Sequence, residues 1–142
     1  MQSTTIHIEG IEIPITCGIR FIKEAQKFYS MPTMNKLLIH IQSLFPTQVP
    51  NENGGFDFVE NPNHDITDVT FDLVLLAHKA YCKGAKVAET FNEEVFLDIL
   101  DNGIATNLSY LLESFIEHFT FCMNFGIKPD SDKKKVIPIP TN

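Results

Sequence analysis

The chain has 142 residues, of which 44% are apolar and 20% are charged, and its formal net charge at pH 7 is −7. This composition is typical of one soluble domain whose core needs no metal or disulfide. No apolar run approaches the length that spans a bilayer, and the first residues lack the pattern of a secretory signal, so we expect a cytoplasmic protein.

The charge is distributed unevenly along the chain. Residues 1–45 carry a net charge of +1, residues 46–126 carry −10, and residues 127–142 carry +2. Nucleic-acid binding needs a basic face that neutralises phosphates, so an acidic middle with a single arginine, Arg20, argues against such a partner. An acidic surface either keeps the protein soluble or docks a basic partner, and both interpretations stay open here.

The first thirty residues predict a β-hairpin that leads into a helix. Isoleucines alternate with polar residues on both sides of Glu9-Gly10, a pair that fits a two-residue turn. This register places Ile6 opposite Ile13 on one apolar face. Over about residues 18–29 the apolar period changes from two to about 3.6, which indicates an amphipathic helix.

Four more helices follow in the predicted order. They run from an N-cap at Thr33 to just before Pro46, from Thr67 or Asp68 to Lys83 with Gly84 ending the helix, from a cap at Asn92 to Asn102-Gly103, and from Thr106 to about Met123. The predicted buried face of the last helix consists of Leu108, Leu111, Leu112, Phe115, Phe119 and Cys122. The second of these is apolar around most of its circumference and is expected at the centre of the fold.

The sequence therefore predicts a mainly α (α+β) fold. An N-terminal β-hairpin and about five helices form one compact domain over residues 1–127, followed by a flexible tail at 128–142. Residues 46–66 are rich in proline, asparagine and glycine and are interpreted as a long loop within the domain.

We find no catalytic set in the sequence. His64 and Asp65 lie near Asp68 and Asp72, with His40 upstream, and such residues occur in metal phosphohydrolases. The surrounding asparagines and proline instead indicate a loop that leads into a helix cap. We therefore expect no catalytic residue, no metal site and no cofactor, and a protein that is not an enzyme.

Isolated histidines and cysteines have structural interpretations as well. His78 and His118 lie on predicted helices among apolar residues, where a histidine is more often satisfied within the fold or exposed than a ligand. Cys17, Cys82 and Cys122 are far apart in apolar settings, which predicts buried, reduced thiols.

Two groups of residues are candidates for binding a partner protein. Two glutamates open the fourth helix, where acids complement the helix dipole and could also dock a basic segment. Phenylalanines crowd the last third of the chain, where core packing explains most of them and an exposed patch would mark a partner site. The candidates are Glu93, Glu94, Phe115, Phe119, Phe121 and Phe125.

Two stretches resemble the tail assembly chaperones of long-tailed phages of Gram-positive hosts. Residues 11–24 (Ile-Glu-Ile-Pro-Ile-Thr-Cys-Gly-Ile-Arg-Phe-Ile-Lys-Glu) are similar to the opening strand and the Gly-aromatic-basic-acidic helix start of that family. Residues 91–101 (Phe-Asn-Glu-Glu-Val-Phe-Leu-Asp-Ile-Leu-Asp) resemble its late helix, with a polar cap, two acids, a valine and an aspartate. The order of elements is similar over about residues 4–125.

This resemblance implies a chaperone that binds the tape-measure protein and keeps that long helical chain soluble while the tail tube assembles around it. Such a protein acts in the host cytoplasm and is absent from the mature virion. The tail-tube protein and a second copy of the chain are further candidate partners, and neither nucleic acid nor a membrane is expected. The alternative is a structural head–tail connector or tail-completion protein, which would stay in the virion.

Overall fold

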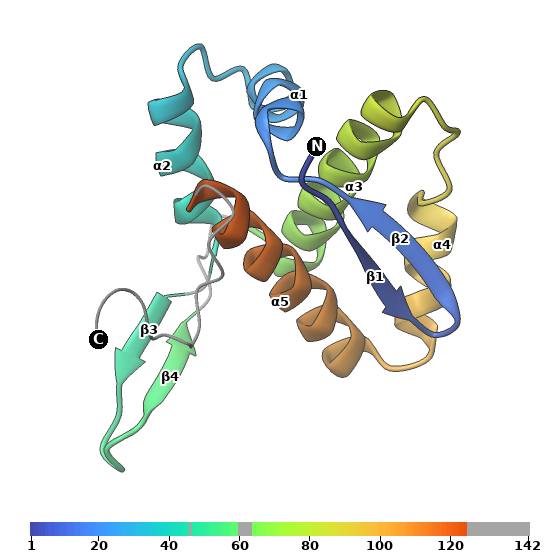
Figure 1. Ribbon diagram of the computed structural model, residues 1–142. Helices are drawn as coiled ribbons and strands as arrows, with labels where there is room; N and C mark the ends of the chain where they lie inside the picture. The colour runs from blue at the N-terminus through green and yellow to red at the C-terminus, as the bar shows by residue number, and fades with distance from the viewer. Residues whose placement is uncertain (46, 60–63, 125–142) are drawn as a thin grey trace, which may run out of the picture.

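The computed structural model describes residues 1–45, 47–59 and 64–124 (Figure 1). An N-terminal antiparallel hairpin is followed by five helices, and a second hairpin lies between the second and third helices. The elements are β1 (Thr4–Ile8), β2 (Ile11–Ile15), α1 (Ile19–Tyr29), α2 (Met34–Leu44), β3 (Thr47–Pro50), β4 (Phe56–Val59), α3 (Ile66–Ala85), α4 (Glu93–Asp101) and α5 (Ile104–Met123). The predicted fold class is confirmed, and the predicted tail at 128–142 lies outside the described residues.

The first hairpin has the predicted register. Ile8 pairs with Ile11 and Ile6 pairs with Ile13, across a two-residue turn. Both turn residues, Glu9 (φ 51°) and Gly10 (φ 76°), are in the left-handed region, which matches the right-handed twist of the strands. The isoleucine face of the hairpin is buried, so the alternation read from the sequence sets which side meets the core.

Helix α3 lies at the centre of the fold, as predicted. It packs against α1, β2 and α5 and buries apolar residues along most of its length. Asp65 caps its start by accepting a hydrogen bond from the Thr67 amide at 2.8 Å. The prediction that Gly84 ends this helix is wrong, because the helix continues to Ala85. A Cβ atom at Gly84 would lie 2.8 Å from Met1 Sδ, so this glycine lets neighbouring side chains approach closely.

The loop predicted over 46–66 is also wrong in part. Residues Thr47–Pro50 and Phe56–Val59 form the antiparallel strands β3 and β4, and Figure 1 shows this hairpin extending away from the helices. The Asn51 side chain accepts hydrogen bonds from the amides of Asn53 and Gly55, both at 3.0 Å, and so closes the turn. Of the residues that indicated a loop, Pro50 therefore ends β3, and Asn51, Asn53, Gly54 and Gly55 belong to the turn of a short hairpin.

Helix α5 crosses the molecule beside β1 and carries part of the core. Of the six residues predicted on its buried face, Leu111 and Phe115 are fully buried, whereas Leu108, Leu112, Phe119 and Cys122 are half-buried. Two polar residues, Asn107 and His118, are buried beside them. The most buried stripe of the helix therefore runs through Asn107, Leu111, Phe115 and His118, and only its two middle residues belong to the predicted face.

Candidate functional site

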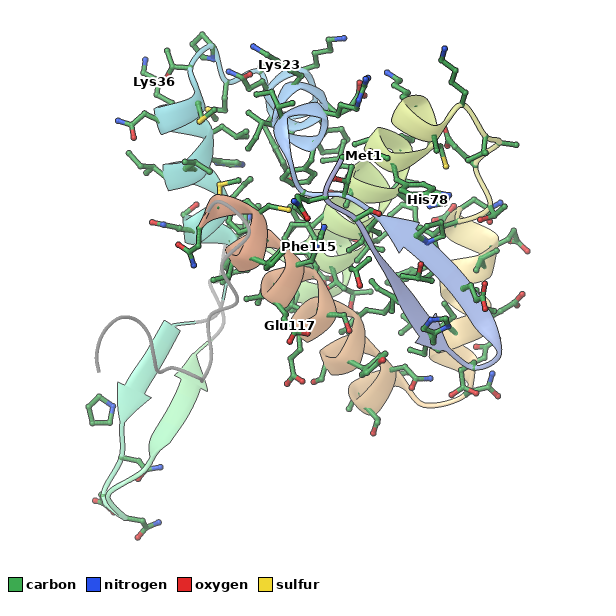
Figure 2. The ribbon with its side chains drawn as sticks, viewed as in Figure 1. Met1, Lys23, Lys36, His78, Phe115 and Glu117 are labelled. Carbon is green, nitrogen blue, oxygen red and sulfur yellow. The ribbon has the colours of Figure 1, made fainter. Side chains whose placement is uncertain are left out.

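A groove lies between β1 and α5, and we call it the β1–α5 groove. It has a volume of about 350 Å³. Its walls are Gln2, Ser3, Thr4, Thr5 and Ile6 on one side, and Tyr110, Ser114, Glu117, His118 and Phe121 on the other. Figure 2 labels Glu117 on α5. The walls combine polar backbone with aromatic and acidic side chains, which suits a peptide segment.

His118 forms one end of this groove. Its side chain is buried, and burial lowers the pKa of the imidazole, an effect that the Gln2 backbone and the Glu117 carboxylate partly oppose. The His118 ring stacks on Phe121 with 6.0 Å between the ring centroids, and its Nε2 atom lies 3.5 Å from Cys122 Sγ. Cys122 is half-buried, whereas the sequence indicated a buried thiol.

The structure describes three of the four phenylalanines that were candidates for partner binding, and it places them in different environments. Phe115 is 0% exposed and packs against Phe21, so it belongs to the core and offers no surface to a partner. Phe119 is half-buried against the same ring, and Phe121 lines the β1–α5 groove. Phe125 lies outside the described residues.

The two glutamate candidates lie on an exposed acidic surface. Glu94, Asp98 and Asp101 follow one face of α4 at helical spacing, and Glu93 is exposed beside them. We call these four residues, together with Leu97, which is 46% exposed, the α4 surface. Between residues 87 and 124 the sequence has seven acidic residues and neither lysine nor arginine, so no cation of α4 or α5 neutralises this surface.

The residues weighed as a metal site do not assemble into one. Asp65 serves as the α3 cap, and the His40 and His64 rings are 6.3 Å apart at their centroids. Burial and the Asp68 carboxylate raise the pKa of Asp72, while burial and His64 lower the pKa of His40. Within residues 1–45, 47–59 and 64–124, no three His, Cys, Asp or Glu side chains are grouped so that they could hold a metal ion.

His78 is a buried polar residue with a structural role that the sequence only partly indicates. It is 0% exposed, and Figure 2 shows it between α3, β2 and the segment that leads to α4. Its Nδ1 atom donates to the Pro14 carbonyl at 2.8 Å, and its Nε2 atom accepts from the amides of Thr90 and Phe91 at 2.9 and 3.3 Å. Of the interpretations open to His78, which were a satisfied histidine, an exposed histidine and a ligand, the satisfied histidine is confirmed.

Comparison with protein-family models, curated proteins and solved structures gives no match to this chain. Among the described residues, no helix is long and apolar enough to cross a membrane. The fold and these surfaces therefore define an α+β protein with an acidic helical surface and a peptide-sized groove.

Proposed function

We propose that this chain is a phage tail assembly chaperone that binds the tape-measure protein and keeps it soluble until the tail tube surrounds it. The observation that supports the proposal is the α4 surface, where four exposed carboxylates surround an exposed leucine and no cation lies nearby in the sequence. The resemblance of residues 11–24 and 91–101 to that family points to the same function.

The α4 surface has the chemistry that a basic amphipathic helix would recognise. Leu97 offers an apolar contact, and Ile104, which is 65% exposed at the start of α5, adds another. Lysine and arginine side chains of the client helix would pair with Glu94, Asp98 and Asp101 around these contacts. The net charge of −7 would also keep a complex with an aggregation-prone client in solution.

The test is a titration of the chain with fragments of the tape-measure protein encoded in the same genome. We expect binding that weakens as salt rises, and about tenfold weaker binding by Glu93→Lys/Glu94→Lys. The matched control is Glu12→Lys/Glu52→Lys, which changes the net charge equally at exposed positions on the two hairpins and is expected to bind within about threefold of the unaltered chain.

Two results would contradict the proposal. The first is equal weakening by both double variants, which would show a response to net charge alone. The second is the chain at stoichiometric level in purified virions, measured by mass spectrometry, which would indicate a connector or tail-completion protein.

A further inference from the structure

A second groove lies between α1 and α3, and we call it the α1–α3 groove. It has a volume of about 310 Å³ and is lined by Glu24, Lys27 and Phe28 of α1 and by Asp72, Leu75, Leu76 and Lys79 of α3. Phe28, which is 54% exposed, and the half-buried Leu75 present apolar surface in this groove. A groove of this kind between two helices suits a helix that carries an apolar side chain on its exposed face.

The α1–α3 groove lies in the basic part of the molecule. Within the residues that the structure describes, every lysine and arginine lies between positions 20 and 86. Figure 2 shows two of these cations, Lys23 and Lys36, at the end of the molecule that α1 and α2 form. On α3, Lys79 and Lys83 recur at helical spacing beside α1. A partner of this groove therefore meets cations around an apolar floor.

The two lysines that line the groove are available to the carboxylates of a partner. Among the described residues, Lys27 forms no ion pair, and Lys79 Nζ lies 3.8 Å from the Glu89 carboxylate in an exposed pair that contributes little. Lys83 already neutralises Glu24 at 2.6 Å. The other lining carboxylate, Asp72, lies two helical turns from Lys79, about 10 Å along α3.

The α4 surface has the complementary pattern. Leu97 is 46% exposed, and carboxylates lie one turn before it, at Glu93 and Glu94, and one turn after it, at Asp101. An apolar side chain among acids matches an apolar floor among lysines. The two surfaces do not meet within one molecule, because α1 packs against α2 and α3 whereas α4 packs against α5, and Figure 1 shows α1 and α4 well apart.

We propose that the α1–α3 groove of one molecule binds the α4 surface of a second copy of the chain. Leu97 of the second copy packs on Phe28 and Leu75, and its neighbouring carboxylates pair with Lys27 and Lys79. The contact joins two different surfaces, so a pair of molecules keeps one groove and one α4 surface unoccupied, and further copies add head to tail. A client helix on the α4 surface would compete with this contact, but the contact does not rest on the proposed function.

The test is sedimentation velocity of the full chain at a series of concentrations. At about 0.05 M salt we expect the average mass to rise with concentration above the 16.1 kDa of the monomer, and at about 0.5 M salt to return to it, because screening weakens the ion pairs. Lys27→Glu/Lys79→Glu and Asp98→Lys/Asp101→Lys should each weaken association by about tenfold. The second variant leaves the first turn of α4 unchanged, where lysine would oppose the helix dipole.

A mixture of the two variants separates this contact from a general effect of charge. Each variant carries like charges on its own two surfaces, whereas an equimolar mixture again offers opposite charges and should associate within about threefold of the unaltered chain. The matched control is Lys23→Glu/Lys36→Glu, which changes the net charge as much as the groove variant does, at exposed positions outside the groove. It should also associate within about threefold of the unaltered chain.

Dilution of the unaltered chain, followed by NMR, gives a readout that needs no substitution. The amide signals of Leu75 and Leu97 should shift together, while that of Ile13 in the core stays constant. A monomer at every concentration in low salt, or a mixture of variants that stays monomeric, would overturn the proposal. Association that either variant leaves unchanged would also overturn it, because another surface would then join the copies. No client is present, so failure here leaves the proposed function unaffected.

Discussion

At the residue scale, His78 shows how one polar side chain can hold distant segments together. It lies on α3 and bonds backbone groups of β2 and of the segment before α4, which are far apart in the sequence. Donation from Nδ1 and acceptance at Nε2 define a neutral ring with its proton on Nδ1. The Phe91 amide is buried and the other two backbone groups are partly buried, and all three bond this single imidazole.

Replacing His78 tests this arrangement. His78→Leu preserves the volume approximately but leaves the Pro14 carbonyl and two amides without partners. We expect the free energy of unfolding to fall by about 2–5 kcal/mol, measured by urea titration. Lys79→Ala, at the adjacent half-buried position, is the control and should cost less than about 1 kcal/mol. A similar loss in both variants would show that the histidine bonds contribute little.

At the element scale, local capping chemistry decides where several helices begin. Thr33 accepts from the Lys36 amide at 3.2 Å, Asp65 caps α3, and Asn92 accepts from the Val95 amide at 3.0 Å. All three caps join residues two or three positions apart, so the sequence contains the whole interaction. The predicted starts of α2 and α4 are confirmed for this reason.

The Asn92 cap supports the α4 surface and can be tested separately from binding. Asn92→Ala removes the acceptor for the Val95 amide, and we expect unfolding to become easier by about 1 kcal/mol in a thermal or urea titration. Asn92→Asp keeps an acceptor at the same position and should stay within about 0.5 kcal/mol of the unaltered chain. If alanine and aspartate behaved alike, the cap would not stabilise α4.

The β3–β4 hairpin shows where element prediction from composition is wrong. Asn51, Gly54 and Gly55 are turn residues, and their density suggested a loop across the whole segment. Asparagine is unfavourable inside a helix or a strand, but here the Asn51 side chain closes the turn by accepting hydrogen bonds from two amides within four residues. Turn residues thus occur both in loops and in short hairpins. Strands of four residues are too short for the alternation of apolar and polar side chains to distinguish a hairpin from a loop.

At the scale of the whole molecule, an aromatic cluster connects the two ends of the described chain. Phe21 on α1 lies 5.5 Å from Phe115 and 6.0 Å from Phe119 on α5, measured between ring centroids, and the two α5 rings are 5.7 Å apart. These residues are almost a hundred positions apart in the sequence. Their packing therefore depends on the complete fold.

Removing the central ring should destabilise the whole domain. We expect Phe115→Ala to lower the free energy of unfolding by about 3–5 kcal/mol, because it leaves a cavity between α1 and α5. Tyr110→Ala, on the exposed face of the same helix, should cost less than about 1 kcal/mol. Circular dichroism during urea titration measures both. If Phe115→Ala lowered the free energy of unfolding no more than Tyr110→Ala does, Phe115 would not be a central residue of the core.

The sequence by itself determined the features that depend on neighbouring residues. The register of the first hairpin, two helix caps and the central position of α3 follow from alternation, short-range hydrogen bonds and an apolar circumference. Glu93 and Glu94 were also placed correctly at the exposed start of α4, because charge at a helix start is a local property.

Only the tertiary structure decided which face of each element is buried and which surfaces remain open. Phe115 and Phe121 have the same side chain on the same helix, yet one fills the core and the other lines a groove. Asn107 and His118 are buried on α5 although both side chains are polar. Burial of Asn107 is compensated by the hydrogen bond that its side chain donates to the Ile99 carbonyl at 2.8 Å. These outcomes depend on contacts between residues far apart in the chain, and no local pattern contains the orientation of one element against another.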